Sequence, residues 1–169
     1  MKPEIYWIDG TEPGRLAILA RPRGGDWLAD EVRGWREAGV DVVVSALTVE
    51  EETEWELNEE AGLCRKHGLE FVSFPITDRG VPSSEREASE LAIQLAGAWN
   101  QGRSVGIHCR AGIGRSTLIA ASVLLTLGVD FDGAWHRIGA ARGRPVPDTP
   151  EQKEWVRRFT SDATVARSA

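Results

Sequence analysis

Short apolar segments alternate along this chain with longer segments in which apolar residues recur every three or four positions. The short segments predict strands over residues 5–8, 15–20, 41–47, 69–74 and 103–108. The helical spacing predicts helices over residues 26–38, 58–67, 84–99, 116–127, 131–142 and 149–159. Asp26 and the Thr48-x-x-Glu51 pattern indicate helix starts, because side-chain oxygens there accept hydrogen bonds from backbone N–H groups.

This alternation of strand and helix predicts an α/β fold. We expect a single domain over residues 1–160, with a central, mostly parallel sheet flanked by helices on both faces. Residues 161–169 are predicted to form a flexible C-terminal tail. A length of 169 residues and a hydrophobic content of 41% are sufficient for one domain with a substantial core.

The segment HCRAGIGRS, residues 108–116, joins the predicted strand 103–108 to the predicted helix 116–127. A loop in that position directs its backbone N–H groups into one concavity, and the following helix adds the positive end of its dipole. Such a loop binds a tetrahedral oxyanion. The same field stabilises a thiolate, so we expect Cys109 to be a nucleophile that attacks phosphorus.

The other residues of this loop suit phosphate binding. Gly112 and Gly114 let the backbone turn tightly and approach the phosphate oxygens without a Cβ in the way. Arg115 can donate two parallel hydrogen bonds to equatorial oxygens, which suits arginine better than lysine. Ser116 is suited to cap the helix and to donate its hydroxyl to the sulfur when the thiolate leaves. The predicted phosphate-binding residues are Arg110, Ala111, Gly112, Ile113, Gly114 and Arg115.

The segment resembles the His-Cys-x5-Arg-Ser/Thr motif of the cysteine-dependent protein tyrosine phosphatase superfamily, including its Ala-Gly-Ile-Gly-Arg-Ser form. A bare Cys-x5-Arg is weak, whereas the extended match between a predicted strand and a predicted helix is specific. The resemblance implies hydrolysis of phosphomonoesters through a phosphocysteine intermediate, with no cofactor. It also implies that His108 organises the loop by hydrogen bonding rather than acting as a base. The alternative is a glycine-rich connection with a buried cysteine.

A general acid must protonate the leaving oxygen, and Asp78 is the candidate. It lies in the segment FPITDRGVP, residues 74–82, whose two prolines and one glycine suit a loop that moves as a unit. The chain between Asp78 and Cys109 is long enough for one helix and one strand, which return it to the same edge of the sheet. The segment looks like that of dual-specificity and cyclin-dependent-kinase-inhibitor-associated phosphatases. The alternative is a solvated aspartate in a turn.

Gln152 and Cys64 each allow two interpretations. The superfamily resemblance implies that Gln152, near the start of the last helix, positions the hydrolytic water. The other interpretation of this segment is an ordinary helix start, with Asp148 or Thr149 as the cap. The resemblance also makes Cys64 a candidate disulfide partner for an oxidised Cys109, although a buried and inert cysteine is the more common case.

Charge and cysteine content narrow the partners and the location. A net charge of −6 argues against nucleic acid or a membrane surface as a partner recognised through bulk charge. Two cysteines do not make a disulfide framework, and a thiolate nucleophile needs a reducing compartment, so we expect the protein to be cytoplasmic. We also expect it to be a monomer. No cluster of histidine and cysteine has the spacing of a metal site.

Two further groups of residues have structural interpretations. The acidic segment 50–60 is predicted to be a solvated helix face. Trp7 or Trp55 could wall a substrate cleft. The remaining tryptophans fall on helical segments and are predicted to belong to the core: Trp27, Trp35, Trp99, Trp135 and Trp155.

The substrate class is the least constrained part of the prediction. Few residues precede the first strand, so we expect an open pocket that accepts phosphotyrosine and also phosphoserine or phosphothreonine in proteins. Arg110 suits both lipid and protein phosphatases, and Ile113 stands where inositol-lipid enzymes carry a second basic residue. The alternatives are a phosphatase of inositol phosphates or small phosphorylated metabolites, and a phosphate-binding module without turnover. A sulfurtransferase fits the Arg-Ser ending of the loop less well.

Overall fold

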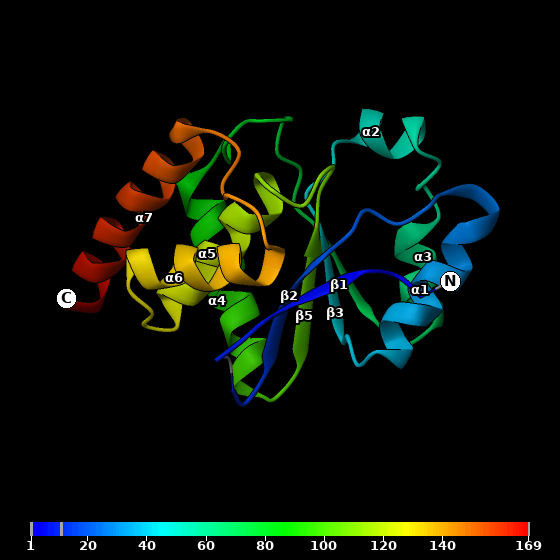
Figure 1. The fold of residues 1–169 in the computed structure, drawn as a ribbon, viewed down its shortest axis with the longest axis horizontal. Helices are drawn as coiled ribbons and strands as arrows, with labels where there is room; N and C mark the ends of the chain where they lie inside the picture. The colour runs from blue at the N-terminus through cyan, green and yellow to red at the C-terminus, as the bar shows by residue number, and fades with distance from the viewer. Residues whose placement is uncertain (1, 11, 169) are drawn as a thin grey trace.

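Five strands form a single sheet through the centre of the molecule, in the order β1-β2-β5-β3-β4 (Figure 1). The computed structural model describes the backbone of residues 2–10 and 12–168, with side chains up to residue 159. β1 pairs antiparallel with β2, and all other neighbours pair parallel, which confirms the predicted sheet. The strands are β1 (Ile5–Ile8), β2 (Arg15–Leu19), β3 (Val42–Ser45), β4 (Glu70–Ser73) and β5 (Ser104–His108).

Helices cover both faces of this sheet, as predicted (Figure 1). One face carries α1 (Leu28–Glu37) and α3 (Glu60–Lys66), and α2 (Val49–Glu54) stands at the end of the sheet. The other face carries α4 (Glu85–Asn100), α5 (Arg115–Thr126), α6 (Phe131–Arg142) and α7 (Pro150–Ser168). Along β2, Leu16 and Ile18 pack with the second group, whereas Ala17 and Leu19 pack with the first. This alternation follows from the two-residue period of a strand.

The central strands β3 and β5 are buried along their whole length because both of their faces are covered. All four residues of β3 (VVVS) and all five of β5 (SVGIH) are buried. Helix α5 is buried on nearly every side, because it packs against β5 and lies among α4, α6 and α7. The segment that joins β5 to α5 is therefore held between two rigid elements.

Helix starts and tryptophans differ from the predictions in places. Asp26 lies in a single 3₁₀ turn, η1 (Gly25–Trp27), and α1 begins at Leu28 with no side-chain cap. Trp27 is 57% exposed, so its predicted place in the core is wrong. Thr48 and Glu51 form the predicted capping box at α2. Of the other tryptophans predicted to be core, one is half-buried and three are buried: Trp99, and Trp35, Trp135 and Trp155.

Helix α7 continues to Ser168, past its predicted end at residue 159. It therefore includes most of the segment 161–169, and residue 169 lies outside the described residues. The flexibility of this segment stays a prediction. Over residues 2–10 and 12–168, no helix is both long enough and apolar enough to span a membrane.

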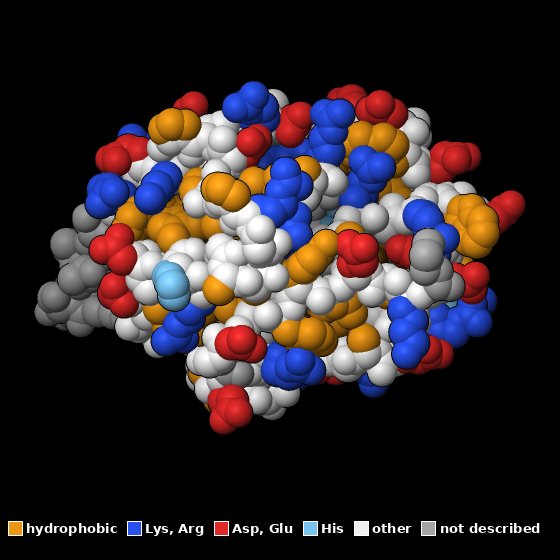
Figure 2. Space-filling model, viewed as in Figure 1, with side chains coloured by type: hydrophobic (Ala, Val, Ile, Leu, Met, Phe, Trp, Pro, Cys, Tyr) orange, Lys and Arg blue, Asp and Glu red, His pale blue; other side chains and the backbone are white. Residues whose placement is uncertain are grey.

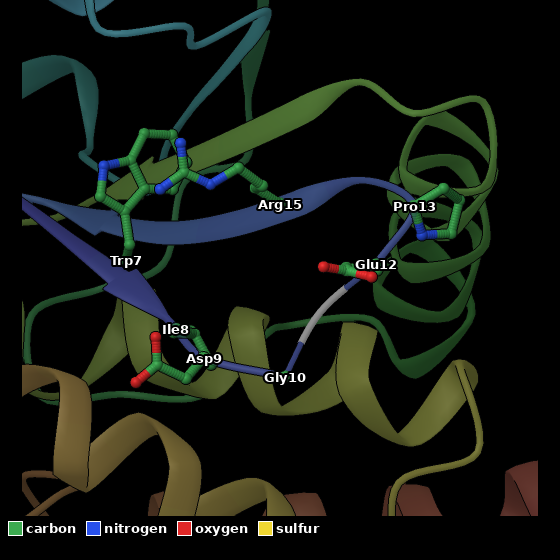
Figure 3. A pocket seen from close by; sticks show the side chains of 7 residues that line it. All are labelled: Trp7, Ile8, Asp9, Gly10, Glu12, Pro13 and Arg15. Carbon is green, nitrogen blue, oxygen red and sulfur yellow. The ribbon is translucent and has the colours of Figure 1, made fainter.

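The carboxyl ends of the parallel strands lie at one end of the sheet, where the segments that follow β2, β3, β4 and β5 gather (Figure 1). The hairpin between β1 and β2 lies at the opposite end, beside the amino ends of the parallel strands. It borders a hollow of about 560 Å³, where Arg15 stacks on Trp7 with its guanidinium carbon 3.5 Å from the ring centre (Figure 3). Among the described residues that line this hollow there is no cysteine, serine or threonine. The catalytic residues predicted from the sequence lie at the other end of the sheet, at the carboxyl ends of the parallel strands.

Candidate active site

The loop between β5 and α5 forms a tight cradle that depends on its glycines. Gly112 has a φ of +70°, a conformation that residues with a side chain rarely adopt. A Cβ on Gly114 would lie 2.9 Å from the side-chain amide of Gln152. Arg142 of α6 donates hydrogen bonds to the carbonyl oxygens of Gly112 and Ala111, at 2.8 and 3.4 Å. Arg142 does not line the cavity and was not predicted from the sequence, yet it fixes the outer side of the loop.

The cradle forms part of a cavity of about 200 Å³. Four of the five predicted catalytic residues line it: Cys109, Asp78, Arg115 and Gln152. All the predicted phosphate-binding residues except Gly112 line it as well. Positions that are distant in the sequence therefore meet in one place, as the loop prediction requires.

Cys109 is nearly buried in this cavity, and its Sγ lies 3.2 Å from Oγ of Ser116. A hydroxyl at that distance can donate a hydrogen bond to a thiolate, as predicted. The other part of the prediction for Ser116, that it caps the helix, is wrong. Helix α5 begins at Arg115 after Gly114, and no side chain caps it. The serine hydroxyl is available to the sulfur for that reason.

Arg115 is only 2% exposed and reaches across the loop. Its two terminal nitrogens donate to the two carboxylate oxygens of Glu51, at 2.6 and 2.9 Å, and one of them also donates to the carbonyl of Ile76 at 2.9 Å. Burial alone would raise the pKa of Glu51, but hydrogen bonds from Arg115 and from the Thr48 backbone outweigh it and lower that pKa. Burial lowers the pKa of Arg115, and its bonds with Glu51 and the charge of Cys109 raise it by more. Arg115 therefore stays a cation.

Asp78 lies above the cradle, in the loop after β4. Its two carboxylate oxygens accept from Arg115 at 3.3 Å and from Arg110 at 3.2 Å. The side chain is 44% exposed, so it is neither buried nor a freely solvated turn residue. Next to it, Arg79 has a φ of +60° and pairs with Asp148 of the segment before α7 at 3.3 Å. The structure thus brings the predicted acid to the cavity, and its role as proton donor stays a prediction.

Gln152 is fully buried and ties the start of α7 to the Asp78 loop. Its Oε1 accepts from the backbone N–H groups of Asp148 and Thr149, both at 3.1 Å. Its Nε2 donates to the carbonyl of Gly80 at 3.1 Å. Thr149 accepts from the Gln152 backbone, as a helix cap does. The predicted ordinary helix start is therefore present, while Gln152 also borders the cavity, and its contact with a hydrolytic water stays a prediction.

His108 lies behind the loop and meets a carboxylate that the sequence analysis placed in solvent. Its Nε2 is 2.5 Å from Oε1 of Glu60, and the two side chains are 0% and 2% exposed. Trp35 stacks on the imidazole, with ring centres 5.9 Å apart. His108, which is predicted to organise the loop, therefore has a buried hydrogen-bond partner in Glu60.

Two residues of the acidic segment 50–60 thus hold the loop, and the prediction of a solvated face is wrong for them. Glu51 binds Arg115, and Glu60 binds His108. The signal for Glu51 was its place in the capping box, which fixes where its carboxylate points. A signal for Glu60 existed in its helical spacing with Leu57 and Cys64, both of which are buried.

Cys64 lies in the apolar cluster on the α1 side of the sheet, whereas Cys109 belongs to the cluster on the other side. Both thiols are free. Burial, with a smaller contribution from Glu60, raises the pKa of Cys64 to about 12. These properties suit an inert core cysteine, and a disulfide with an oxidised Cys109 stays untested.

Basic side chains gather at the mouth of the cavity. Figure 2 shows lysine and arginine side chains, with acidic side chains among them, over the end of the sheet where α2 and the loop after β5 lie. Trp55 also lies there, with the Arg110 guanidinium carbon 5.5 Å from its ring centre. Of the two tryptophans predicted as a cleft wall, Trp55 is near the site, whereas Trp7 lies at the opposite end of the sheet, near the β1–β2 hairpin.

The fold resembles solved phosphatase structures over nearly its whole length. Kinase associated phosphatase (KAP), solved with serine in place of its catalytic-site cysteine, has a TM-score of 0.87 and 21% identity, covering 97% of each chain. Tk-PTP in its active form has a TM-score of 0.76 and 25% identity, covering 95% of this chain and 99% of its own. PTPMT1 in complex with PI(5)P has a TM-score of 0.74 and 23% identity, covering 91% of this chain and 94% of its own. These likenesses establish the fold.

The family is established by sequence. No curated protein sequence matches the chain. Residues 18–129 match the family Tc-R-P, described as polymorphic toxin system, DSP-PTPase phosphatase. This match covers well over half of the chain and includes the whole cradle. The chain therefore belongs to the DSP-PTPase phosphatases of the Tc-R-P family and is a cysteine-dependent phosphatase.

Proposed function

We propose that the chain hydrolyses phosphotyrosine residues in proteins, and also phosphoserine and phosphothreonine residues, as a monomer in the cytoplasm. The observation that carries this proposal is the meeting of Cys109, Arg115 and Asp78 in one cavity. A half-exposed Asp78 leaves the mouth open, which supports access for protein side chains of different lengths. A thiolate nucleophile at Cys109 needs a reducing compartment to stay active, which supports the cytoplasm as its location.

In the first step, the Cys109 thiolate attacks phosphorus, so that an S–P bond forms and the bond to the leaving oxygen breaks. Asp78 gives its proton to that oxygen and becomes a carboxylate. Arg115 and the backbone N–H groups of the loop neutralise the charge on the equatorial oxygens. Glu51 holds both terminal nitrogens of Arg115, which keeps the guanidinium in the plane that a phosphate needs.

In the second step, water attacks the phosphocysteine and the S–P bond breaks. Asp78, now a carboxylate, takes the proton from the water. Ser116 stabilises the departing thiolate, because its hydroxyl lies 3.2 Å from the sulfur. Inorganic phosphate leaves, and Cys109 and Asp78 return to their starting protonation states.

The test of this assignment compares two carboxylates that line the same cavity. Asp78→Asn should lower turnover of aryl phosphates by about 10²–10⁴, because a general acid is lost. The loss should shrink for leaving groups that need no proton. Asp148→Asn is the matched control, because Asp148 lines the cavity and, among the residues whose side chains the structure describes, forms an ion pair with Arg79 alone. An equal loss for good and poor leaving groups, or a larger loss in the Asp148 variant, would show that Asp78 is not the donor.

The substrate preference is tested with peptides that carry phosphotyrosine, phosphoserine or phosphothreonine in one sequence. We expect measurable kcat/KM for all three, with phosphotyrosine the highest. The second candidate is an inositol phosphate. It is favoured by the basic rim at Arg110 and by the likeness to PTPMT1, whose solved complex contains PI(5)P. A kcat/KM for inositol phosphates above that for every peptide would replace the first proposal by the second.

A further inference from the structure

One indole ring at the mouth of the cavity carries two guanidinium groups. The guanidinium carbon of Arg21 lies 3.9 Å from the Trp55 ring centre, and that of Arg110 lies 5.5 Å from it. Arg21 follows β2, Trp55 follows α2, and Arg110 follows Cys109 in the cradle. Three segments that are distant in sequence therefore bring two guanidinium groups to one indole ring, and one of them, Arg110, lines the cavity of the nucleophile.

The position of Arg21 is fixed by the packing of its segment. The backbone N–H of Gly25 donates to the carbonyl of Glu56 at 3.0 Å. A Cβ on Gly24 would lie 1.8 Å from the carbonyl oxygen of Trp55, so only glycine allows this close approach. The segment after β2 thus rests directly on the backbone at Trp55. Arg21 is held against the ring by this seat rather than extended into solvent.

The arginines near the mouth of the cavity differ in whether a carboxylate pairs with them. Arg23 pairs with Glu31 at 2.6 Å, and Arg79 pairs with Asp148 at 3.3 Å. Among the residues whose side chains the structure describes, no carboxylate lies within ion-pair distance of Arg21. Its guanidinium lies over the Trp55 ring instead.

The counter-charge of Arg110 is lost during the proposed reaction. Its partner is Asp78, at 3.2 Å. As the general acid, Asp78 must be protonated when substrate is bound, and a neutral carboxyl no longer neutralises Arg110. At that moment neither guanidinium at the Trp55 ring has a charged carboxylate within ion-pair distance among the residues whose side chains the structure describes.

We propose that Arg21, Trp55 and Arg110 form a second anion subsite, which binds a carboxylate or a second phosphate of the same substrate molecule, close to the phosphate on Cys109. This inference rests on the proposed function and specifies its substrate class. The carboxylates of α2 lie on the neighbouring turn and oppose an anion at Trp55. The subsite therefore depends on both guanidiniums, and the loss of Arg21 alone should abolish it.

The test uses matched substrates that differ by one negative charge. The first pair is a phosphotyrosine peptide flanked by glutamate and the same peptide flanked by glutamine. The second pair is an inositol bisphosphate and a monophosphate, measured as inhibitors of phenyl phosphate hydrolysis. The unmodified chain should favour the more charged member by about fivefold, the range of an exposed ion pair, through KM or Ki rather than kcat.

Arg21→Gln should remove this preference and leave hydrolysis of phenyl phosphate unchanged. Arg23→Gln is the matched control, because it removes a charge from the same segment at a residue that pairs with Glu31 instead. It should keep the preference, and Arg21→Lys should keep part of it. A preference in the peptide pair alone identifies a protein carboxylate as the anion, and a preference in the inositol pair alone identifies a second phosphate.

Two results would overturn the subsite. One is no preference in either pair, and the other is an equal loss of preference in the Arg21 and Arg23 variants, which would indicate a diffuse field. Failure of the phosphatase proposal is a separate result, seen as no hydrolysis of phenyl phosphate under reducing conditions. In that case calorimetric binding of the same pairs, with and without Arg21→Gln, still decides whether the subsite exists.

Discussion

Two glutamates from one acidic segment hold the phosphate loop from opposite sides, and their surroundings differ. Glu51 lies at the mouth, partly exposed, and binds Arg115 with both oxygens. Glu60 lies behind the loop, almost fully buried, and meets His108 through one oxygen. Its second oxygen and Nδ1 of His108 are buried without a hydrogen-bond partner among the described residues.

The difference teaches what each pair contributes. At the mouth, Arg115 must be shared with a substrate phosphate, so the Glu51 pair needs to orient the guanidinium and still let it accept a second anion. Behind the loop, the Glu60–His108 pair does not have to exchange partners with a substrate. The buried carboxylate of Glu60 is tolerated only because His108 is its partner. We expect the Glu51 pair to affect activity most and the Glu60 pair to affect stability most.

The largest difference between the mouth and the interior should appear in the alkylation rates of the two thiols, Cys109 and Cys64. At pH 6, iodoacetamide should alkylate Cys109 at least a thousandfold faster than Cys64. Cys109 lines the cavity in the field of Arg115, whereas the pKa of the buried Cys64 is raised to about 12. Mass spectrometry of the alkylated chain measures both rates, and inorganic phosphate should protect Cys109. Comparable labelling of the two cysteines would remove the distinction between mouth and interior.

The next effect concerns the buried pair. Glu60→Ala should lower the free energy of unfolding by about 3–5 kcal/mol, because the buried His108 loses its side-chain hydrogen-bond partner among the described residues. Glu60→Gln, which keeps an oxygen near Nε2, should cost less. The neighbouring Glu59 is exposed, and Glu59→Ala should change stability by less than about 0.5 kcal/mol. Denaturant unfolding measures all three, and a loss below 1 kcal/mol for Glu60→Ala would mean that the pair is dispensable.

A smaller effect is expected at the mouth. Glu51→Gln should lower kcat/KM for aryl phosphates by about tenfold, because the amide nitrogen that replaces one carboxylate oxygen cannot accept from Arg115 and the remaining bond loses its charge. Glutamine still completes a capping box with Thr48, so the start of α2 is preserved. Glu50→Gln, at an exposed neighbour, is the control. If both variants keep full activity, Glu51 does not position the arginine.

Glu51→Gln should also change how the free energy of unfolding depends on pH in the acid range. The pKa of Glu51 is lowered in the folded chain, so its contribution is fully present above its ordinary value of 4.5 and is lost as pH falls through the lowered value. Below pH 4.5 the unmodified chain should therefore lose more stability than Glu51→Gln. Thermal unfolding between pH 3 and 6 measures the difference, and parallel curves would contradict the assignment.

The elements and the cradle could be predicted because their signals are local. Each strand was visible as an apolar run, and the segment between Cys109 and Ser116 encodes its own turn through Gly112 and Gly114. Asp78 was found because its loop has a recognisable composition. The helix starts at Asp26 and Ser116 were wrong because capping depends on one or two backbone angles that neighbouring packing decides.

The sequence by itself determined the order of strands and helices, the nucleophile loop and the candidate acid. Only the tertiary structure decided which carboxylates leave solvent. Glu51, Glu54 and Glu60 look alike in one acidic segment, yet only those that face Arg115 or His108 across the fold are drawn to the loop. The physical reason is that a charge is buried only where a partner far along the chain arrives to meet it. The same holds for Arg21, whose role depends on Trp55 and Arg110 rather than on its own neighbours.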